Sequence, residues 1–237
     1  MAGSNPIVLV RRMLRLVLAT VLLAHGGAAD ATTEADVRRL QWDLVWTGHY
    51  EGTVDGRPGP STRRAIRSYQ ASLGAPETGE LSDDQWERLE EQATAIEADM
   101  GWTIYESPQA GYRIGYPAAI LPVTRSIDTT GQEFSSEDGS VTLATLVTGP
   151  DSEESLRQSY DRIVDDNADV IAYQIFKPTW FAVSYVIGES GYYVMSKRKP
   201  AATARYVLRW PKAEDAFFRP LATAIYNSFA VSDDLRD

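Results

Sequence analysis

Polar and apolar positions along the chain follow two different periodicities. From about residue 35 to residue 95, apolar residues recur every three to four positions, the spacing of an amphipathic helix. Beyond about residue 100 the apolar residues alternate with polar ones or form short β-branched and aromatic runs. The change predicts a helical domain over residues 30–98 and a larger domain over residues 99–237. The expected fold class is α+β, with a small three-helix domain followed by a mainly antiparallel sheet covered by two helices.

Three helices are predicted in the helical domain. The first extends from about residue 37 to the stop signal Gly48, and the second from residue 61 or 62 to about residue 73. The third starts at the capping-box pattern of residues 82–85. A hydroxyl of Ser61 or Thr62 is expected to cap the second helix. Gln41 is the polar exception on the first apolar stripe, and we expect its amide to bond to buried backbone groups of the following loop.

The larger domain is predicted to hold seven strands and two helices. Its strands are expected at residues 102–106, 112–116, 141–148, 170–176, 180–187, 191–197 and 204–210. Its helices are expected at residues 153–167 and 214–229. Each of these helices has one apolar face, so both are expected on one side of the sheet.

The stretch between the first two helices carries an ordered set of glycine, aromatic and polar residues. In chain order, counting the end of the first helix, the set is Leu40-Gln41, Gly48, Tyr50, Gly52, Asp55-Gly56, Gly59, Thr62, Ala65 and Tyr69-Gln70. Over about residues 35–95 this pattern resembles the type 1 peptidoglycan-binding domain, a three-helix module of cell-wall proteins. The resemblance implies that the module docks on peptidoglycan.

Five residues of this stretch are the candidates for peptidoglycan binding. Tyr50 offers an aromatic platform for a sugar face, and Arg57 and Arg63 can pair with the carboxylates of stem peptides. Asp55 can accept from ligand amides, but an Asx turn within its own loop explains an Asp-Gly pair completely, and we favour that role. Thr62 belongs to the same motif, although helix capping accounts for it without a ligand.

Residues 1–29 have the pattern of a Sec-type signal peptide. Three arginines precede the apolar run of residues 16–24, and small residues offer a cleavage site near Ala29. A periplasmic or secreted protein is therefore expected. An uncleaved leader would instead anchor the chain, and only in that case is a membrane partner expected.

Net charge and cysteine content exclude several classes of function. The formal net charge of −10 becomes −13 once the three leader arginines are removed, so binding to nucleic acid is not expected. The chain has no cysteine, which excludes disulfides, thiol nucleophiles and thiolate metal sites.

The sequence offers few candidates for catalytic residues. The two histidines are His25, in the leader, and His49, so an imidazole zinc site is not available, and no metal or cofactor is expected. Glu189-Ser190 has the form of the start of a lytic transglycosylase motif, but Glu189 falls in a glycine-bounded turn between two predicted strands, whereas that motif belongs on a helix. No catalytic residue is assigned, and the protein is not expected to be an enzyme.

The larger domain resembles Mog1/PsbP-like domains of exported bacterial proteins. The resemblance lies in the order of its elements and in two short phrases, Tyr112-Arg113-Ile114-Gly115-Tyr116-Pro117 and Asn227-Ser228-Phe229. We therefore expect an exported, non-catalytic cell-wall binding protein whose C-terminal domain serves interaction or assembly with a periplasmic protein. Two alternatives stay open: a peptidoglycan hydrolase with an unrecognised carboxylate site, and a protein-binding scaffold that no longer binds glycan.

Overall fold

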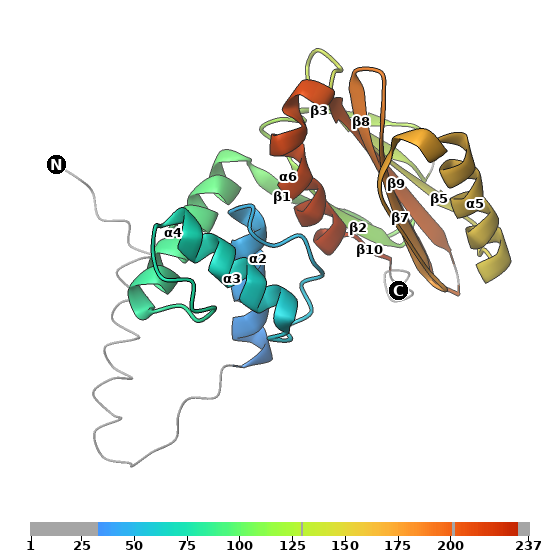
Figure 1. Cartoon of the computed structure of the whole chain (residues 1–237). Coiled ribbons are helices and arrows are strands. Elements are labelled where there is room, and N and C mark those ends of the chain that lie inside the picture. The colour runs from blue at the N-terminus through green and yellow to red at the C-terminus, as the bar shows by residue number, and fades with distance from the viewer. Residues whose placement is uncertain (1–32, 129, 201, 232–237) are drawn as a thin grey trace. The chain divides into compact units, whose positions relative to one another are not determined.

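The computed structural model describes residues 33–128, 130–200 and 202–231 (Figure 1). Within them, the chain from Glu34 to Val231 belongs to one compact unit. It opens with three helices: α2 (Glu34–Trp46), α3 (Pro60–Ser72) and α4 (Asp83–Asp99). Their apolar stripes meet in a common core that contains Leu44, Tyr69 and Leu89, each no more than 1% exposed. The predicted three-helix domain is confirmed.

The ends of the three helices follow local signals, with one correction. The capping box of α4 is present: the Ser82 side chain accepts from the Gln85 amide, and the Gln85 side chain accepts from the Ser82 amide. The expected cap of α3 by Ser61 or Thr62 is wrong, because α3 starts at Pro60 with Gly59 as its N-cap and no side-chain cap bond. Proline suits that first position because it has no N–H to satisfy.

Ten strands and two further α-helices make up the rest of the described chain. The strands are β1 (Trp102–Ser107), β2 (Tyr112–Pro117), β3 (Val123–Ser126), β4 (Gln132–Ser135), β5 (Thr142–Thr148), β6 (Ile171–Lys177), β7 (Trp180–Ile187), β8 (Ser190–Arg198), β9 (Thr203–Pro211) and β10 (Ala230–Val231). The helices are α5 (Glu153–Asp166) and α6 (Asp215–Ser228), and short 3-10 turns lie at Ala168–Val170 and Lys212–Glu214.

The strands form two antiparallel sheets. The smaller sheet has the order β1-β2-β10, and the larger has the order β3-β4-β5-β9-β8-β7-β6. The α+β class with a mainly antiparallel sheet is therefore confirmed. The division predicted between residues 98 and 99 stays a prediction; α4 ends at Asp99 and β1 begins at Trp102.

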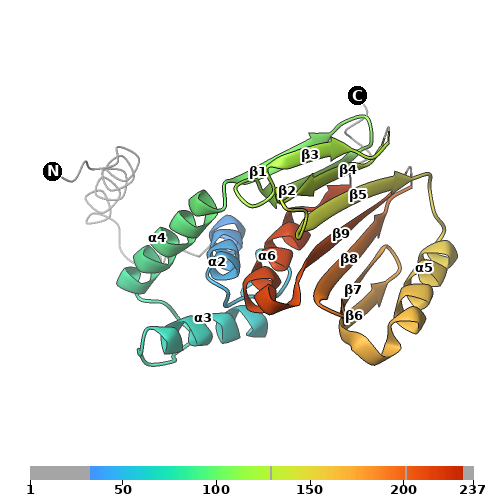
Figure 2. The same cartoon turned by 90° about the horizontal axis from the view of Figure 1, so that it is seen from above.

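The two helices of the larger domain cover opposite faces of the seven-stranded sheet, not one side as predicted (Figures 1 and 2). Leu156 of α5 packs on Phe181 and Val183 of β7. The alternate residues of the same strand face α6, where the Trp180 ring lies 6.0 Å from the Tyr226 ring. Successive side chains of a strand point to opposite faces of the sheet. A strand with apolar residues on both faces therefore needs another element packed against each face.

Candidate functional site

The loop between α2 and α3 is held by one buried amide. Gln41 is 0% exposed, and its Oε1 accepts a 2.9 Å hydrogen bond from the Gly56 N–H. Its Nε2 lies 3.1 Å from Asp55 Oδ1, 3.2 Å from the Arg57 carbonyl oxygen and 3.2 Å from Thr62 Oγ1. Gly56 has a φ of +76°, and a Cβ there would lie 2.5 Å from the Glu34 side chain. The role predicted for Gln41 is confirmed.

A second buried amide repeats this arrangement in the turn between α3 and α4, and the sequence analysis missed it. Gln70 is 1% exposed, and its Oε1 accepts from the Gly79 N–H at 2.9 Å. Its Nε2 lies near Thr78 Oγ1, the Glu80 carbonyl oxygen and Gln85 Oε1, at 2.9, 2.8 and 3.1 Å. The signal was present, because Tyr69-Gln70 repeats the apolar-Gln pair of Leu40-Gln41 on a second helix.

Three of the five predicted ligand residues belong to the framework of the loop. Tyr50 is 6% exposed, and its hydroxyl donates to the Thr53 carbonyl oxygen at 2.8 Å. Asp55 accepts from the Arg57 N–H at 2.9 Å, and the bonds from Arg57 and Gln41 hold the pKa of its carboxyl below the usual value. Thr62 is 2% exposed and donates to the Arg57 carbonyl oxygen at 3.3 Å.

The other two predicted residues present their charge to the surface. Arg57 and Arg63 are both exposed, and neither forms an ion pair among the described residues. Arg63 donates only to the Pro58 carbonyl oxygen, at 3.2 Å. Helix α3 adds Arg64 and Arg67 and contains no acidic residue. This loop and helix carry four arginines, the exposed Arg57, Arg63 and Arg64 and the half-buried Arg67, which we call the arginine face; the loop also carries the exposed carboxylates of Glu51 and Asp55.

His49 lies beside the loop without adding charge to the arginine face. Its Nδ1 is 2.9 Å from Ser68 Oγ, and its ring packs edge-on against Tyr69 with centroids 5.4 Å apart. Burial lowers its pKa below the usual value, so the ring is neutral at pH 7.

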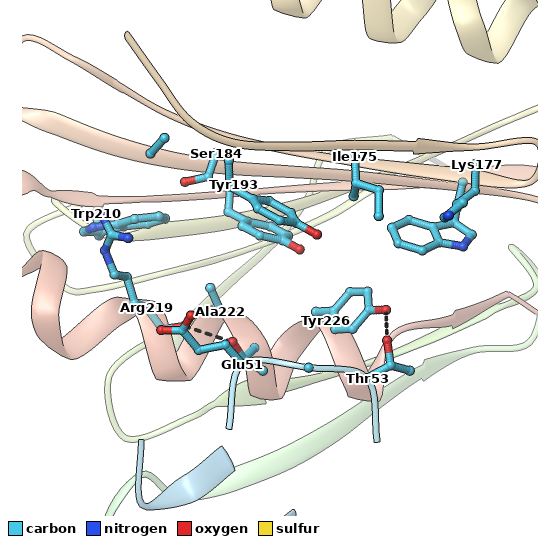
Figure 3. Close-up of a pocket in the computed structure, with 15 residues that line it drawn as sticks. Glu51, Thr53, Ile175, Lys177, Ser184, Tyr193, Trp210, Arg219, Ala222 and Tyr226 are labelled. Carbon is cyan, nitrogen blue, oxygen red and sulfur yellow. Dashed lines mark hydrogen bonds between the residues drawn. The ribbon is translucent and has the colours of Figure 1, made fainter. Parts of the chain in front are cut away.

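The same loop also forms one wall of a cleft, which has a volume of about 470 Å³ and is drawn in Figure 3. The loop contributes Glu51, Gly52 and Thr53; the other walls are α6 and the sheet face that α6 covers. Five aromatic side chains line it: Tyr173, Trp180, Tyr193, Trp210 and Tyr226. The sequence analysis did not predict this cleft. We call it the aromatic cleft.

Hydrogen bonds between the loop and α6 fix the shape of the aromatic cleft. Asn227 of α6 accepts from the Val54 N–H at 2.7 Å and donates to the Gly52 carbonyl oxygen at 3.0 Å. The hydroxyls of Thr53 and Tyr226 are 2.6 Å apart, as Figure 3 shows. Helix α6 also packs against α2. The backbone of the loop is therefore held by hydrogen bonds to two side chains, Gln41 of α2 and Asn227 of α6.

A second hollow lies on the surface of α2 and α4. It is lined by residues that include Trp42, Trp102, Glu97 and the carboxyl of Asp43. Burial raises the pKa of Asp43 to about 7, although the Arg39 guanidinium, 4.0 Å away, opposes that rise. Burial also raises the pKa of Glu97.

Residues 33–128, 130–200 and 202–231 contain no cluster of three or more His, Cys, Asp or Glu placed to hold a metal ion. In this part of the chain no helix is both long and apolar enough to cross a bilayer. Glu189 lies in the turn between β7 and β8, as predicted, and is exposed. The predicted signal peptide lies outside the described residues.

The fold defines a small three-helix module followed by an α+β domain. Residues 33–89 match the family described as "Putative peptidoglycan binding domain". The resemblance read from the sequence is therefore confirmed for the helical module, and the match supports a binding role with peptidoglycan as a partner.

Comparison with solved structures finds low similarity. The solution structure of cyanobacterial PsbP (CyanoP) from Synechocystis sp. PCC 6803 is 11% identical, with a TM-score of 0.42, over 55% of this chain and 92% of that one. A crystal structure from Bacteroides thetaiotaomicron VPI-5482 is 10% identical, with a TM-score of 0.39, over 55% of this chain and 48% of that one. No curated protein matches the sequence.

Proposed function

We propose that this protein is an exported, non-catalytic peptidoglycan-binding protein whose helical module contacts the wall through the arginine face. The observation that carries the proposal is that the family match, residues 33–89, contains Arg57 and Arg63, two exposed cations that form no ion pair with any described residue. The stem peptides of peptidoglycan carry carboxylates, which a guanidinium can bind with two parallel hydrogen bonds. The leader pattern of residues 1–29 supports export to the compartment that holds this ligand.

The framework residues have a different part in the proposal. Tyr50, Asp55 and Thr62 hold the loop in shape and leave the ligand contacts to the two arginines. A rigid loop limits the conformational entropy that binding would otherwise cost. The C-terminal domain would then serve interaction or assembly with a periplasmic protein.

Co-sedimentation with purified sacculi tests the proposal. The variant Arg57→Ala/Arg63→Ala removes two charges from the arginine face. Arg113→Ala/Arg125→Ala, both exposed on the C-terminal domain, removes the same charge elsewhere. Loss of two charge-assisted contacts is expected to weaken binding at least about tenfold, and the control variant should sediment like the wild type.

Two results would count against the proposal. If the two double variants sediment equally, the arginine face is not the contact. If the wild type itself stays in the supernatant, the module has become a protein-binding scaffold and the search moves to protein partners.

The hollow around Asp43 favours one alternative, a wall hydrolase. A carboxyl whose pKa is raised to about 7 beside half-buried indole rings is the kind of group that protonates a glycosidic oxygen. Zymography on gels loaded with sacculi separates the two functions. A cleared band at the protein's mass that disappears in Asp43→Asn would replace the non-catalytic assignment.

A further inference from the structure

The aromatic cleft has the size and wall composition of a small-molecule site. Its volume of about 470 Å³ lies within the range of about 300–1,000 Å³ that is usual for such sites. In Figure 3 the Tyr193 side chain projects from the sheet and the Tyr226 side chain from α6, into the space between the two elements. Trp180 adds an indole ring whose centroid is 6.0 Å from that of Tyr226, at an interplanar angle of 51°. The cleft therefore offers several flat aromatic surfaces in different orientations.

Polar groups without partners are placed among these rings. The hydroxyls of Tyr193 and Ser184 form no hydrogen bond with any of the described residues, although the two residues are directly paired across β7 and β8. The indole N–H of Trp180 has no partner in that part of the chain either. Polar groups in sheltered positions are nearly always hydrogen-bonded, so an unpaired set in one cleft is available to a ligand. Burial raises the pKa of Tyr193, which therefore keeps its proton and can both donate and accept.

The charges at the rim are mixed and sparse. The charged residues that line the cleft are Lys177, Glu51 and Arg219. The Arg219 guanidinium is already paired with the Asp215 carboxylate, at 2.5 Å. Phosphorylated ligands need a convergent set of cations, which these residues do not supply. An aliphatic chain would cover the aromatic rings but leave the hydroxyls and the indole N–H without partners, at a cost in free energy.

A sugar ring meets both requirements, because it has apolar C–H faces for stacking and hydroxyl and amide groups for hydrogen bonds. We propose that the aromatic cleft binds a short N-acetylated oligosaccharide, with Trp180 and Tyr226 stacking on its rings and Tyr193 and Ser184 bonding to its polar groups. This site is separate from the arginine face, since it lies against the sheet of the C-terminal domain. The choice of an N-acetylated sugar, like its assignment to wall glycan, rests on the proposed function.

Isothermal titration calorimetry of the full chain tests the cleft with chitotetraose, with a disaccharide-tetrapeptide muropeptide, and with maltotetraose, which lacks acetamido groups. The wild type is expected to bind the first two more tightly than the third. Tyr193→Phe removes one hydroxyl and should weaken binding about three- to tenfold. Trp180→Ala should weaken it further. Tyr192→Phe, the neighbouring residue on the opposite face of β8, should bind like the wild type.

The outcomes separate this site from the arginine face. The variant Arg57→Ala/Arg63→Ala should bind chitotetraose like the wild type, while its binding to sacculi should weaken at least about tenfold. If the wild type sediments with sacculi but gives no heat with chitotetraose at millimolar concentration, the cleft proposal fails and the wall-binding proposal stands. Equal affinity for maltotetraose would overturn the N-acetylated class. Equal losses in Tyr193→Phe and Tyr192→Phe would overturn the placement of the site.

Discussion

Replacement of Gln41 by leucine removes the amide that shapes the loop while keeping the side chain nearly the same size. The largest effect falls on the Gly56 N–H, which is buried and donates to Gln41 Oε1 at 2.9 Å. Leucine offers no acceptor, so this donor would stay buried without a partner. The Nε2 contacts with the Arg57 carbonyl oxygen and Thr62 Oγ1 would be lost as well.

The expected loss of unfolding free energy follows from these bonds. A buried donor left unpaired costs about 1–3 kcal/mol, and a lost hydrogen bond of ordinary strength about 0.5–1.5 kcal/mol. Arg57 lies at the surface, where water can replace the amide, so we count the unpaired Gly56 N–H and one further bond. The free energy of unfolding should therefore fall by about 2–4 kcal/mol. At about 2–4 °C per kcal/mol for a unit of this size, the melting temperature should fall by roughly 4–16 °C.

Urea unfolding followed by circular dichroism measures this change. The matched control is Gln158→Leu, at an exposed position of α5 where the amide bonds only to Glu154 at 3.0 Å. That substitution should change the free energy of unfolding by no more than about 0.5 kcal/mol. A Gln41→Leu variant that unfolds at the same urea concentration as the control would refute the assignment of the loop's stability to this amide.

Two further predictions concern Asp43 and Asn227. Burial raises the pKa of Asp43 from 3.8 to about 7, so its contribution to stability is complete below about pH 4 and is lost as the pH rises through about 7. The free energy of unfolding of Asp43→Asn should equal that of the wild type at pH 4 and exceed it by up to about 4 kcal/mol at pH 8. If urea unfolding gives the same difference between the two proteins at both pH values, this prediction is wrong. Asn227→Ala leaves the Val54 N–H and the Gly52 carbonyl oxygen without their partner, so stability should fall by about 1–3 kcal/mol and the sugar affinity of the cleft should fall with it. Unchanged calorimetry would show that this brace does not shape the cleft.

Sequence alone predicted the helical module because its signals are local. Gly48 and Gly74 have φ values of +76° and +65° two residues beyond the ends of α2 and α3, where a residue with a side chain would be strained. Gln41 was predicted correctly for a related reason, since a polar residue on an apolar stripe must find a partner nearby. In contrast, β3, β4 and β10 were missed, because strands of four, four and two residues carry too little alternation to be recognised.

The features that sequence could not predict depend on contacts between distant segments. The aromatic cleft is closed by the bond between Thr53 and Tyr226, which are 173 positions apart. The burial of Tyr50 could not be predicted either, because its aromatic ring suits a sugar platform as well as a core position. Likewise, the placement of α5 and α6 on opposite faces depends on which face of the sheet each helix covers, and an amphipathic pattern does not specify that.

The two buried glutamines have a consequence for how the module responds to its surroundings. Gln41 and Gln70 hold their turns through uncharged amides, and the one carboxylate among their partners, Asp55, has its pKa held below the usual value. Mobile ions screen charges but leave such buried hydrogen bonds almost untouched. The loop should therefore keep its shape from dilute buffer to molar salt. A salt titration of sacculus binding would then report the Coulomb contact of the arginine face and not a change in the shape of the loop.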